Sequence, residues 1–326
     1  MTGVQTCALP IFYWIRNDSV LVNHRANALV PLASTVKTII AIEFAQQAAI
    51  GKIKLEERIP LGELSRFYIK DTDGGAHPAW IEDLKKAKLI QGNTVPLLEV
   101  AKGMIQFSSN ANTEFLMWKL GLTNINANLP KLGLSKHQAL YPFVSALYVC
   151  SDEHSATGMK KMPMSLYLQR ANTYFELLKV DTTAKTKFNL ANIPLPVQRV
   201  WSDRLPASTA HEYAGLMQKI NSRTYFDATT QAVLDQLMEW PMRMNSENKK
   251  EFNHFGAKGG STAFVLNYVL YATDKKGNRT QFVVFINNLG VFDQTLLQAE
   301  FQVFIKKVLT NKAETRDIQL ILKRMK

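Results

Sequence analysis

The sequence predicts an α+β fold, in which an antiparallel sheet is flanked by helices and interrupted by an inserted all-helical lobe. Two short strand patterns, at 12–16 and 19–23, lie near the start of the chain around an Asn-Asp turn. Strand patterns rich in Val, Phe and Tyr return only near the end, and helical spacing prevails between them. We therefore expect one sheet that is built from both ends of the chain.

Helical spacing begins at Ser34, shortly after Pro31, and continues to about Ile50, where Gly51 ends the helix. Ten of the 17 residues in 34–50 are apolar, including the run 39–42, so we expect the helix to be buried on most sides. Further helices are expected, in chain order, at 80–89, 96–107, 110–120, 124–132, 164–178, 209–220 and 229–238.

In the last part of the chain, strand patterns replace the helical spacing. Strand patterns occupy 253–258, 264–273 and 280–287, and the last two are joined by a hairpin turn at 274–278. A final helix is expected at 294–309. The predicted organisation is a single two-lobed domain over 12–311, with a sheet lobe (12–60 and 200–311), a helical lobe (61–199) and a basic tail (312–326).

The composition is that of a globular protein with a substantial core. The chain has 326 residues, of which 46% are hydrophobic and 20% are charged. Its formal charge is +12, but the lysines are spread along the chain and no zinc-finger or RNA-recognition spacing accompanies them. We interpret the charge as a solvated basic surface and expect no nucleic-acid partner. No apolar run reaches the ~18 residues that a membrane span needs.

The opening Met1–Ile11 resembles a translated short-read sequencing adapter whose GTG start is read as Met. Our hypothesis is that these residues are an artefact of a contig end and that native sequence begins near Phe12. The lack of a recognisable signal peptide then says nothing against export. Of the two cysteines, Cys7 lies in this opening and Cys150 does not, so no disulfide framework is predicted.

Ser34 and Lys37 form a Ser-x-x-Lys pattern at the start of the first helix. Residues three apart share a helical face, so the amine can reach the hydroxyl. A serine hydroxyl needs a neighbouring base to take its proton, and a lysine whose pKa is lowered by burial or nearby cations can serve. The pattern predicts Ser34 as a nucleophile and Lys37 as its base.

Ser108-Ser109-Asn110 lies where one expected helix ends and the next begins. The Ser108 hydroxyl can pass a proton to a leaving nitrogen, and the Asn110 amide can hold both a lysine and a substrate amide. The simpler alternative is that Ser108 caps the following helix.

Lys258-Gly259-Gly260-Ser261 ends an expected strand. Glycines there let a substrate backbone lie against the strand edge. Lys258 would supply a charge for a carboxylate, and Ser261 would supply a hydroxyl. The simpler alternative is that Lys258 is an edge-strand lysine that discourages aggregation.

The three patterns occur in one order and on suitable elements: a helix start, a helix junction and a strand end. With them, the sequence resembles the penicillin-binding protein and serine β-lactamase superfamily, and most closely its class A β-lactamase-like branch. The segments 104–116 and 237–240 are also similar to the central and late helices of that family. The resemblance runs from Phe12 to about Leu309 and implies a β-lactamase/transpeptidase-like fold.

The resemblance implies the following catalytic roles. Ser34 attacks a carbonyl and becomes acylated, and Lys37 is the base for that step. Ser108 relays a proton to the leaving nitrogen, and Asn110 steadies Lys37 and the substrate.

The resemblance also implies how the substrate binds. Lys258 and Ser261 bind its carboxylate, with Gly260 between them on the strand. The backbone N–H groups of Ser34 and Ser261 form the oxyanion hole.

Three departures from the family pattern bear on turnover. Class A β-lactamases carry a Glu-x-x-Leu-Asn loop whose glutamate activates the water that clears the acyl-enzyme, and Tyr141–Tyr148, at the corresponding distance, has no Glu. Gly259 replaces the usual Thr or Ser, and Ser109 replaces the usual Asp. The span from Ser108 to Lys258 is also longer, which indicates a segment inserted near the site.

The leading hypothesis is a serine hydrolase that forms an acyl-enzyme with β-lactams and then hydrolyses it. One alternative is a cell-wall D,D-peptidase with the same acylation chemistry, and another is a non-catalytic binding module that keeps the fold. The expected partner is a β-lactam or a peptidoglycan-derived peptide, the expected location is periplasmic or extracytoplasmic, and the expected state is a monomer.

No metal or cofactor is predicted. The six histidines show no His-Glu-x-x-His pairing, so neither a metal site nor a Ser-His-Asp triad is supported. No Gly-rich phosphate loop occurs.

Overall fold

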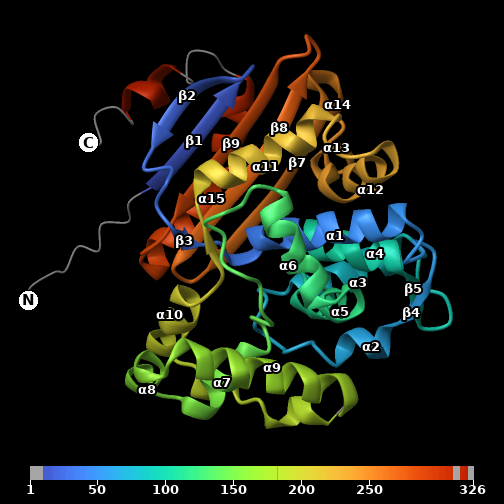
Figure 1. Cartoon of the computed structure of the whole chain (residues 1–326), viewed down its shortest axis with the longest axis vertical. Coiled ribbons are helices and arrows are strands. Elements are labelled where there is room, and N and C mark those ends of the chain that lie inside the picture. The colour runs from blue at the N-terminus through green and yellow to red at the C-terminus, as the bar shows by residue number, and fades with distance from the viewer. Residues whose placement is uncertain (1–9, 182, 311–315, 322–326) are drawn as a thin grey trace, which may run out of the picture. The chain divides into compact units, whose positions relative to one another are not determined.

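The computed structural model describes residues 10–181, 183–310 and 316–321, and its packing divides the chain into two units (Figure 1). The sheet unit comprises 1–35, 207–231 and 238–326, and the helical unit comprises 36–206 and 232–237. The predicted α+β class is confirmed. The helical unit begins earlier than the expected residue 61, because α1 (Lys37–Ala49) packs against α5 (Asn110–Leu120) and α6 (Leu122–Lys131).

The sheet unit contains a five-stranded antiparallel sheet in the order β2-β1-β9-β8-β7 (Figure 1). Pairing of β1 with β9 joins the two ends of the chain, as the sequence predicts. The strands are β1 (Pro10–Arg16), β2 (Ser19–His24), β7 (Phe252–Thr262), β8 (Val265–Asp274) and β9 (Arg279–Ile286). The helices are α11 (Ala210–Ser222), α13 (Trp240–Met244), α14 (Asn248–Glu251) and α15 (Val291–Thr310), and α12 (Ala228–Met238) has residues in both units.

Side chains alternate along the strands, and this gives the sheet two apolar faces. Val284 of β9 belongs to the buried core that also contains Phe301 of α15. The next residue, Phe285, points the other way and contacts Tyr213 of α11, with 5.8 Å between the ring centroids. Helices α11 and α15 therefore cover opposite faces of the sheet.

Two short ribbons lie outside this sheet. In the sheet unit, β3 (Val30–Pro31) pairs with β6 (Ala207–Ser208), and in the helical unit β4 (Arg58–Pro60) pairs with β5 (Thr94–Pro96). The sequence predicts neither ribbon, because two or three residues are too few to show alternation.

The helical unit differs from the expected pattern at two places. The single helix expected at 96–107 is divided into α4 and a π-helix, and the weakly patterned stretch 150–200 contains short helices besides the expected one at 164–178. Short helices give too few turns for a clear 3.6-residue period. The remaining elements are α2 (Leu61–Ser65), α3 (Ala76–Lys86), α4 (Leu97–Lys102), the π-helix Gly103–Phe107, α7 (Ala146–Glu153), α8 (Ala156–Lys161), α9 (Met164–Val180), the 3₁₀-helices Ala184–Lys187 and Leu190–Asn192, and α10 (Leu195–Asp203).

The two chain ends are described only in part. Most of the suspected adapter segment, residues 1–9, lies outside the described residues, whereas Pro10 and Ile11 belong to β1 and pair with β9. Of the expected basic tail, 316–321 is helical, and 312–315 and 322–326 lie outside the described residues.

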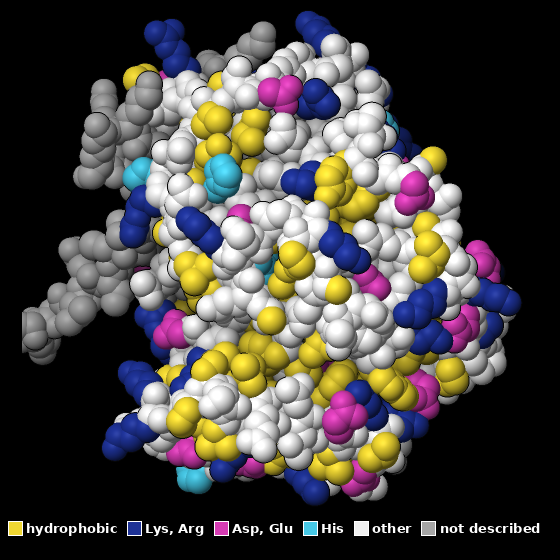
Figure 2. All heavy atoms as spheres, viewed as in Figure 1, with side chains coloured by type: hydrophobic (Ala, Val, Ile, Leu, Met, Phe, Trp, Pro, Cys, Tyr) yellow, Lys and Arg dark blue, Asp and Glu magenta, His cyan; other side chains and the backbone are white. Residues whose placement is uncertain are grey.

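The surface is mixed in charge. Figure 2 shows Lys and Arg side chains scattered among acidic and neutral ones over the face in view, rather than gathered into one patch. Within the described ranges, no helix combines the length and the apolar character that crossing a bilayer requires.

Glu114 of α5 is a fully buried carboxyl group that caps another helix of the helical unit. Its Oε1 accepts the N–H groups of Val144 at 2.9 Å and Ser145 at 3.0 Å, and its Oε2 accepts the Ser145 hydroxyl. These N–H groups directly precede α7, where a helix leaves its first donors without internal partners. Burial raises the pKa of Glu114 to about 7, against the lowering effect of the hydrogen bonds from Ser145 and Val144.

We expect Glu114→Gln to remove a pH dependence of stability. The folded pKa of about 7 lies above the ordinary value of 4.5, so folding favours the protonated acid and stability falls as the pH rises through this window. The full shift corresponds to about 3 kcal/mol. Glutamine stays neutral and keeps an acceptor for both N–H groups. As the pH rises from about 4.5 to about 8, the free energy of unfolding of the variant should therefore increase relative to that of the wild type by up to about 3 kcal/mol.

Urea unfolding of both proteins at several pH values measures this difference. The control is Glu247→Gln, which neutralises an exposed carboxyl group and should leave the pH dependence close to that of the wild type. An identical pH dependence in the wild type and Glu114→Gln would show that Glu114 does not titrate in this window.

Candidate active site

Ser34 lies in the 3₁₀-helix Ala33–Val36, which leads directly into α1, and it is half-buried. Ala33 has a φ of +47°, a conformation that a residue with a Cβ atom rarely adopts. The hydroxyl and the N–H of Thr35 both donate to the carbonyl of Leu32, at 2.6 and 3.2 Å. Ser34 is therefore presented by a tight and strained turn, and such strain clusters at functional sites.

Gly260 of β7 lies directly against this turn within the sheet unit. A Cβ atom at Gly260 would stand 2.7 Å from the backbone nitrogens of Ser34 and Thr35 and 2.9 Å from the carbonyl oxygen of Leu32. Real Cβ atoms do not approach backbone so closely, so only glycine fits. The sequence predicts that this glycine lets a substrate approach the strand. Its lack of a side chain also lets the strand lie against the Ser34 backbone.

Lys258 and Ser261 lie on the same strand as Gly260. Lys258 is buried, and its Nζ donates to the carbonyl of Gly259 at 2.7 Å. Burial lowers the pKa of Lys258 to about 7. Ser261 is exposed near the end of β7, and β7 is an end strand of the sheet formed by the described residues. This end strand thus carries both a buried amine and an exposed hydroxyl.

Lys37, Ser108 and Asn110 come together in the helical unit. Lys37 begins α1 and has no exposed surface, and its Nζ donates to the carbonyl of Ser108 at 2.7 Å. The same nitrogen lies 2.9 Å from Oδ1 of Asn110 and 3.3 Å from Oγ of Ser108. A buried lysine is thus held by oxygen atoms from the junction between the π-helix and α5.

The conformation of Ser108 is set by the π-helix that precedes it. Ser108 ends the π-helix Gly103–Phe107 with a φ of +71°, which is left-handed. This geometry turns both its carbonyl and its hydroxyl toward Lys37. π-Helices are rare and occur frequently at functional sites.

The residue between the two predicted site residues, Ser109, has a separate role. It is the N-cap of α5, and its Oγ accepts the N–H of Asn112 at 3.3 Å. The alternative interpretation of Ser108 as the helix cap is therefore wrong, since the neighbouring hydroxyl makes the cap. Ser109 also contacts His77 of α3, at 2.9 Å between Oγ and Nδ1. Sequence reasoning missed His77, because no spacing rule connects a histidine in α3 with the start of α5.

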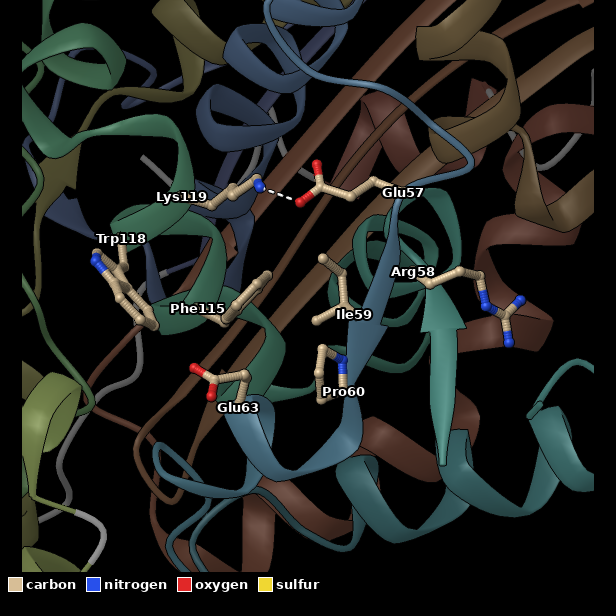
Figure 3. A pocket seen from close by; sticks show the side chains of 8 residues that line it. All are labelled: Glu57, Arg58, Ile59, Pro60, Glu63, Phe115, Trp118 and Lys119. Carbon is tan, nitrogen blue, oxygen red and sulfur yellow. Dashed lines mark hydrogen bonds and ion pairs between the residues drawn. The ribbon is translucent and has the colours of Figure 1, made fainter. Parts of the chain in front are cut away.

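A pocket of about 410 Å³ lies elsewhere in the helical unit. Figure 3 shows the Phe115 ring directed toward Ile59 and Pro60, with Lys119 and Glu57 paired above them. The pocket contains none of the predicted site residues. Its full lining is Glu57, Arg58, Ile59, Pro60, Glu63, Phe115, Trp118 and Lys119.

The described residues give no indication of a metal centre. Nowhere in the described ranges do three or more His, Cys, Asp or Glu side chains gather in a way that could hold an ion.

The segment Tyr141–Tyr148 is held by a carboxyl group from elsewhere in the helical unit. The backbone N–H groups of Val144 and Ser145 bind the buried carboxyl group of Glu114. The segment itself contributes no carboxylate.

The fold is similar to that of solved penicillin-interacting proteins and β-lactamases. PBP-A, which is also solved as a mutant in an acyl-enzyme complex with penicillin G, is 16% identical, with 93% of this chain and 92% of that chain covered and a TM-score of 0.55. A β-lactamase from Burkholderia vietnamiensis is 11% identical, with 94% and 93% covered and a TM-score of 0.58. A representative of class A β-lactamase from Bacteroides cellulosilyticus is 15% identical, with 86% and 83% covered and a TM-score of 0.53. No curated protein sequence matches this chain significantly.

A family model supports the same relationship at the level of sequence. The model described as the Beta-lactamase enzyme family matches residues 9–290. The match includes all three patterns singled out in the sequence and most of the 326 residues. The resemblance to the serine β-lactamase and penicillin-binding protein superfamily is thereby confirmed, and this chain belongs to the beta-lactamase enzyme family.

Proposed function

We propose that this protein is a serine hydrolase in which Ser34 forms an acyl-enzyme with β-lactams or with D-Ala-D-Ala-type amides. The observation that carries the proposal is the position of the buried Lys37 amine, which Ser108 and Asn110 hold at 2.7 and 2.9 Å. Lys37 follows Ser34 by one turn of a continuous helix start. A neutral amine at this position would take up a proton on its nitrogen lone pair.

Acylation would proceed through the following steps. The Ser34 hydroxyl gives its proton to Lys37, and its oxygen attacks the substrate carbonyl. The backbone N–H groups of Ser34 and Ser261 would stabilise the oxyanion, and the close approach of Gly260 to the Ser34 nitrogen supports this role for the strand. Ser108, whose Oγ lies 3.3 Å from the Lys37 nitrogen, would carry the proton onward to the leaving nitrogen.

Substrate recognition would centre on a carboxylate. Lys258 would supply a cation on the end strand of the sheet, and Ser261 would supply an exposed hydroxyl three residues further along that strand. Because burial lowers the pKa of Lys258 to about 7, an anionic ligand would restore the proton and gain a charge-assisted contact. Asn110 would bind the substrate amide through the part of its side chain that Lys37 does not use.

The second half of the reaction separates two candidate activities. β-Lactamase-type hydrolysis is the leading proposal and would link the protein to antibiotic resistance. The absence of a carboxylate in Tyr141–Tyr148 favours the alternative, a cell-wall D,D-peptidase that β-lactams acylate for long periods. Either activity is consistent with a periplasmic or other extracytoplasmic location and with a monomer, and both of these are also proposals.

We expect a penicillin to add one acyl group to the wild type and none to Ser34→Ala, because the substitution removes the hydroxyl that we propose as the nucleophile. Intact mass against time after mixing measures both the adduct and its lifetime. A lasting adduct would support the peptidase, and a transient adduct with consumption of the antibiotic would support the β-lactamase. A folded wild type that never forms an adduct would overturn the proposal in favour of a non-catalytic module.

We expect acylation by a penicillin to weaken as the pH rises through about 7, because the Lys258 cation that binds the carboxylate is lost there. The measurement is kcat/KM, or the second-order acylation rate constant, from about pH 6 to about pH 9. The Lys258→Arg variant keeps its positive charge over this range, so its acylation rate constant should not fall near pH 7. The matched substrate control is the methyl ester of the same penicillin, which lacks the carboxylate. An equal fall with the ester would remove Lys258 as the cause.

We expect Gly260→Ala to slow acylation at least ~100-fold, because the added Cβ would displace the strand from the Ser34 backbone and an oxyanion donor with it. Gly259→Ala is the matched control on the neighbouring residue, where the added Cβ would meet the Tyr268 ring at 3.4 Å and the Asn267 carbonyl oxygen at 3.9 Å. Acylation rates of the two folded variants give the comparison. Equal rates would show that the close approach of Gly260 has no part in the reaction.

A further inference from the structure

We propose that His77 is a positioning residue for Ser108 and Asn110, and that it acts through the hydroxyl of Ser109. The inference rests on the proposed function of those two residues. It starts from the 2.9 Å contact between Nδ1 of His77 and Oγ of Ser109, both within the helical unit.

The direction of the hydrogen bond follows from the partners of Ser109. The Nδ2 group of Asn112 donates to the carbonyl of Val100 at 3.0 Å, so its Oδ1 is the acceptor that faces Ser109. The Ser109 hydroxyl donates to that oxygen at 3.1 Å, and its single hydrogen is then used. His77 must therefore donate from Nδ1. Burial lowers the pKa of His77, so the donor is the neutral Nδ1–H tautomer.

The imidazole is itself held firmly in place. It is buried, and its ring contacts those of Tyr68 and Trp80, with centroids 4.8 and 5.3 Å away. The backbone N–H of His77 donates to the Asp73 carboxylate at 3.0 Å. Because the imidazole cannot move with the Ser109 side chain, its N–H group can restrain the position of the Ser109 hydroxyl.

Ser109 is the peptide link between the two groups that hold Lys37. The carbonyl of Ser108 and the Oδ1 of Asn110 lie on either side of it in the chain, and both accept from the Lys37 nitrogen. Ser108 also has the strained φ of +71°, which its neighbours must maintain. A rotation of Ser109 would move both acceptors, and the Lys37 amine would move with them.

The test compares two substitutions of His77 in the full chain. His77→Phe keeps a ring for Tyr68 and Trp80 but removes the donor, and it should lower the first-order acylation rate constant of Ser34 by about 10- to 100-fold with little change in penicillin binding. His77→Asn places a side-chain amide N–H near the position of Nδ1 and should recover the rate to within about threefold of the wild type. Equal losses in both variants would contradict the proposal.

A double-mutant cycle tests whether His77 acts through Ser109. If it does, His77→Phe combined with Ser109→Ala should be no slower than the slower single variant, because the two changes remove the same contact. A double variant whose losses multiply would overturn the proposal. The matched control is His137→Phe, which replaces another buried histidine, one whose Nδ1 lies 2.6 Å from the carbonyl of Gln138, and it should leave acylation unchanged.

Amide hydrogen exchange separates failure of this inference from failure of the proposed function. His77→Phe should speed exchange at the N–H groups of Ser109 and Asn112, and His137→Phe should not, whether or not the wild type reacts with penicillin. Unchanged exchange in a folded His77→Phe protein would sink the inference even if Ser34 is acylated. If exchange is faster in His77→Phe but penicillin never acylates the wild type, His77 does position this turn, and the proposed acyl-transfer function is wrong.

Discussion

A lysine nitrogen that is removed from water must be surrounded by hydrogen-bond acceptors, and Lys37 imposes this condition on the helical unit. Its side chain has no exposed surface, and the oxygens that surround it come from the start of α5 and the end of the π-helix. The left-handed Ser108, the cap at Ser109 and the network that reaches His77 all serve to place those oxygens. The position of the buried Lys37 amine therefore depends on the backbone conformation of the Ser108–Asn110 turn.

Two further buried ionisable groups, Lys258 and Glu114, have pKa values that burial shifts. For each, removal from water is the largest influence, and it moves both pKa values to about 7. The lysine lies on the strand that would bind a substrate carboxylate, and the carboxyl group holds the segment in which the family's hydrolytic glutamate is missing. Burial thus makes each of these two groups titrate near neutral pH.

The sequence predicts what is local and periodic, and it misses what is distant or short. The Ser34–Lys37 pair depends on helical spacing alone, and the strands β7, β8 and β9 are rich in β-branched and aromatic residues, so these are visible in the sequence. His77 and Ser109 lie 32 residues apart, and Glu114 and Val144 lie 30 apart, and such contacts depend on how helices pack. The π-helix, the 3₁₀ start of α1 and the small ribbons are one turn or a few residues long, below the length at which a period can be recognised.

The π-helix has a consequence for comparing this protein with its relatives. A π-turn contains more residues than the α-turn it replaces, so it behaves like a one-residue insertion in the chain. An ungapped alignment that is anchored on α4 would therefore pair Ser108 or Ser109 with the wrong position in a relative whose helix is regular. Alignments anchored on α5, which begins at Asn110, keep the register of the whole Ser108–Asn110 turn. At identities between 11% and 16%, that choice of anchor decides which serine is read as the functional one.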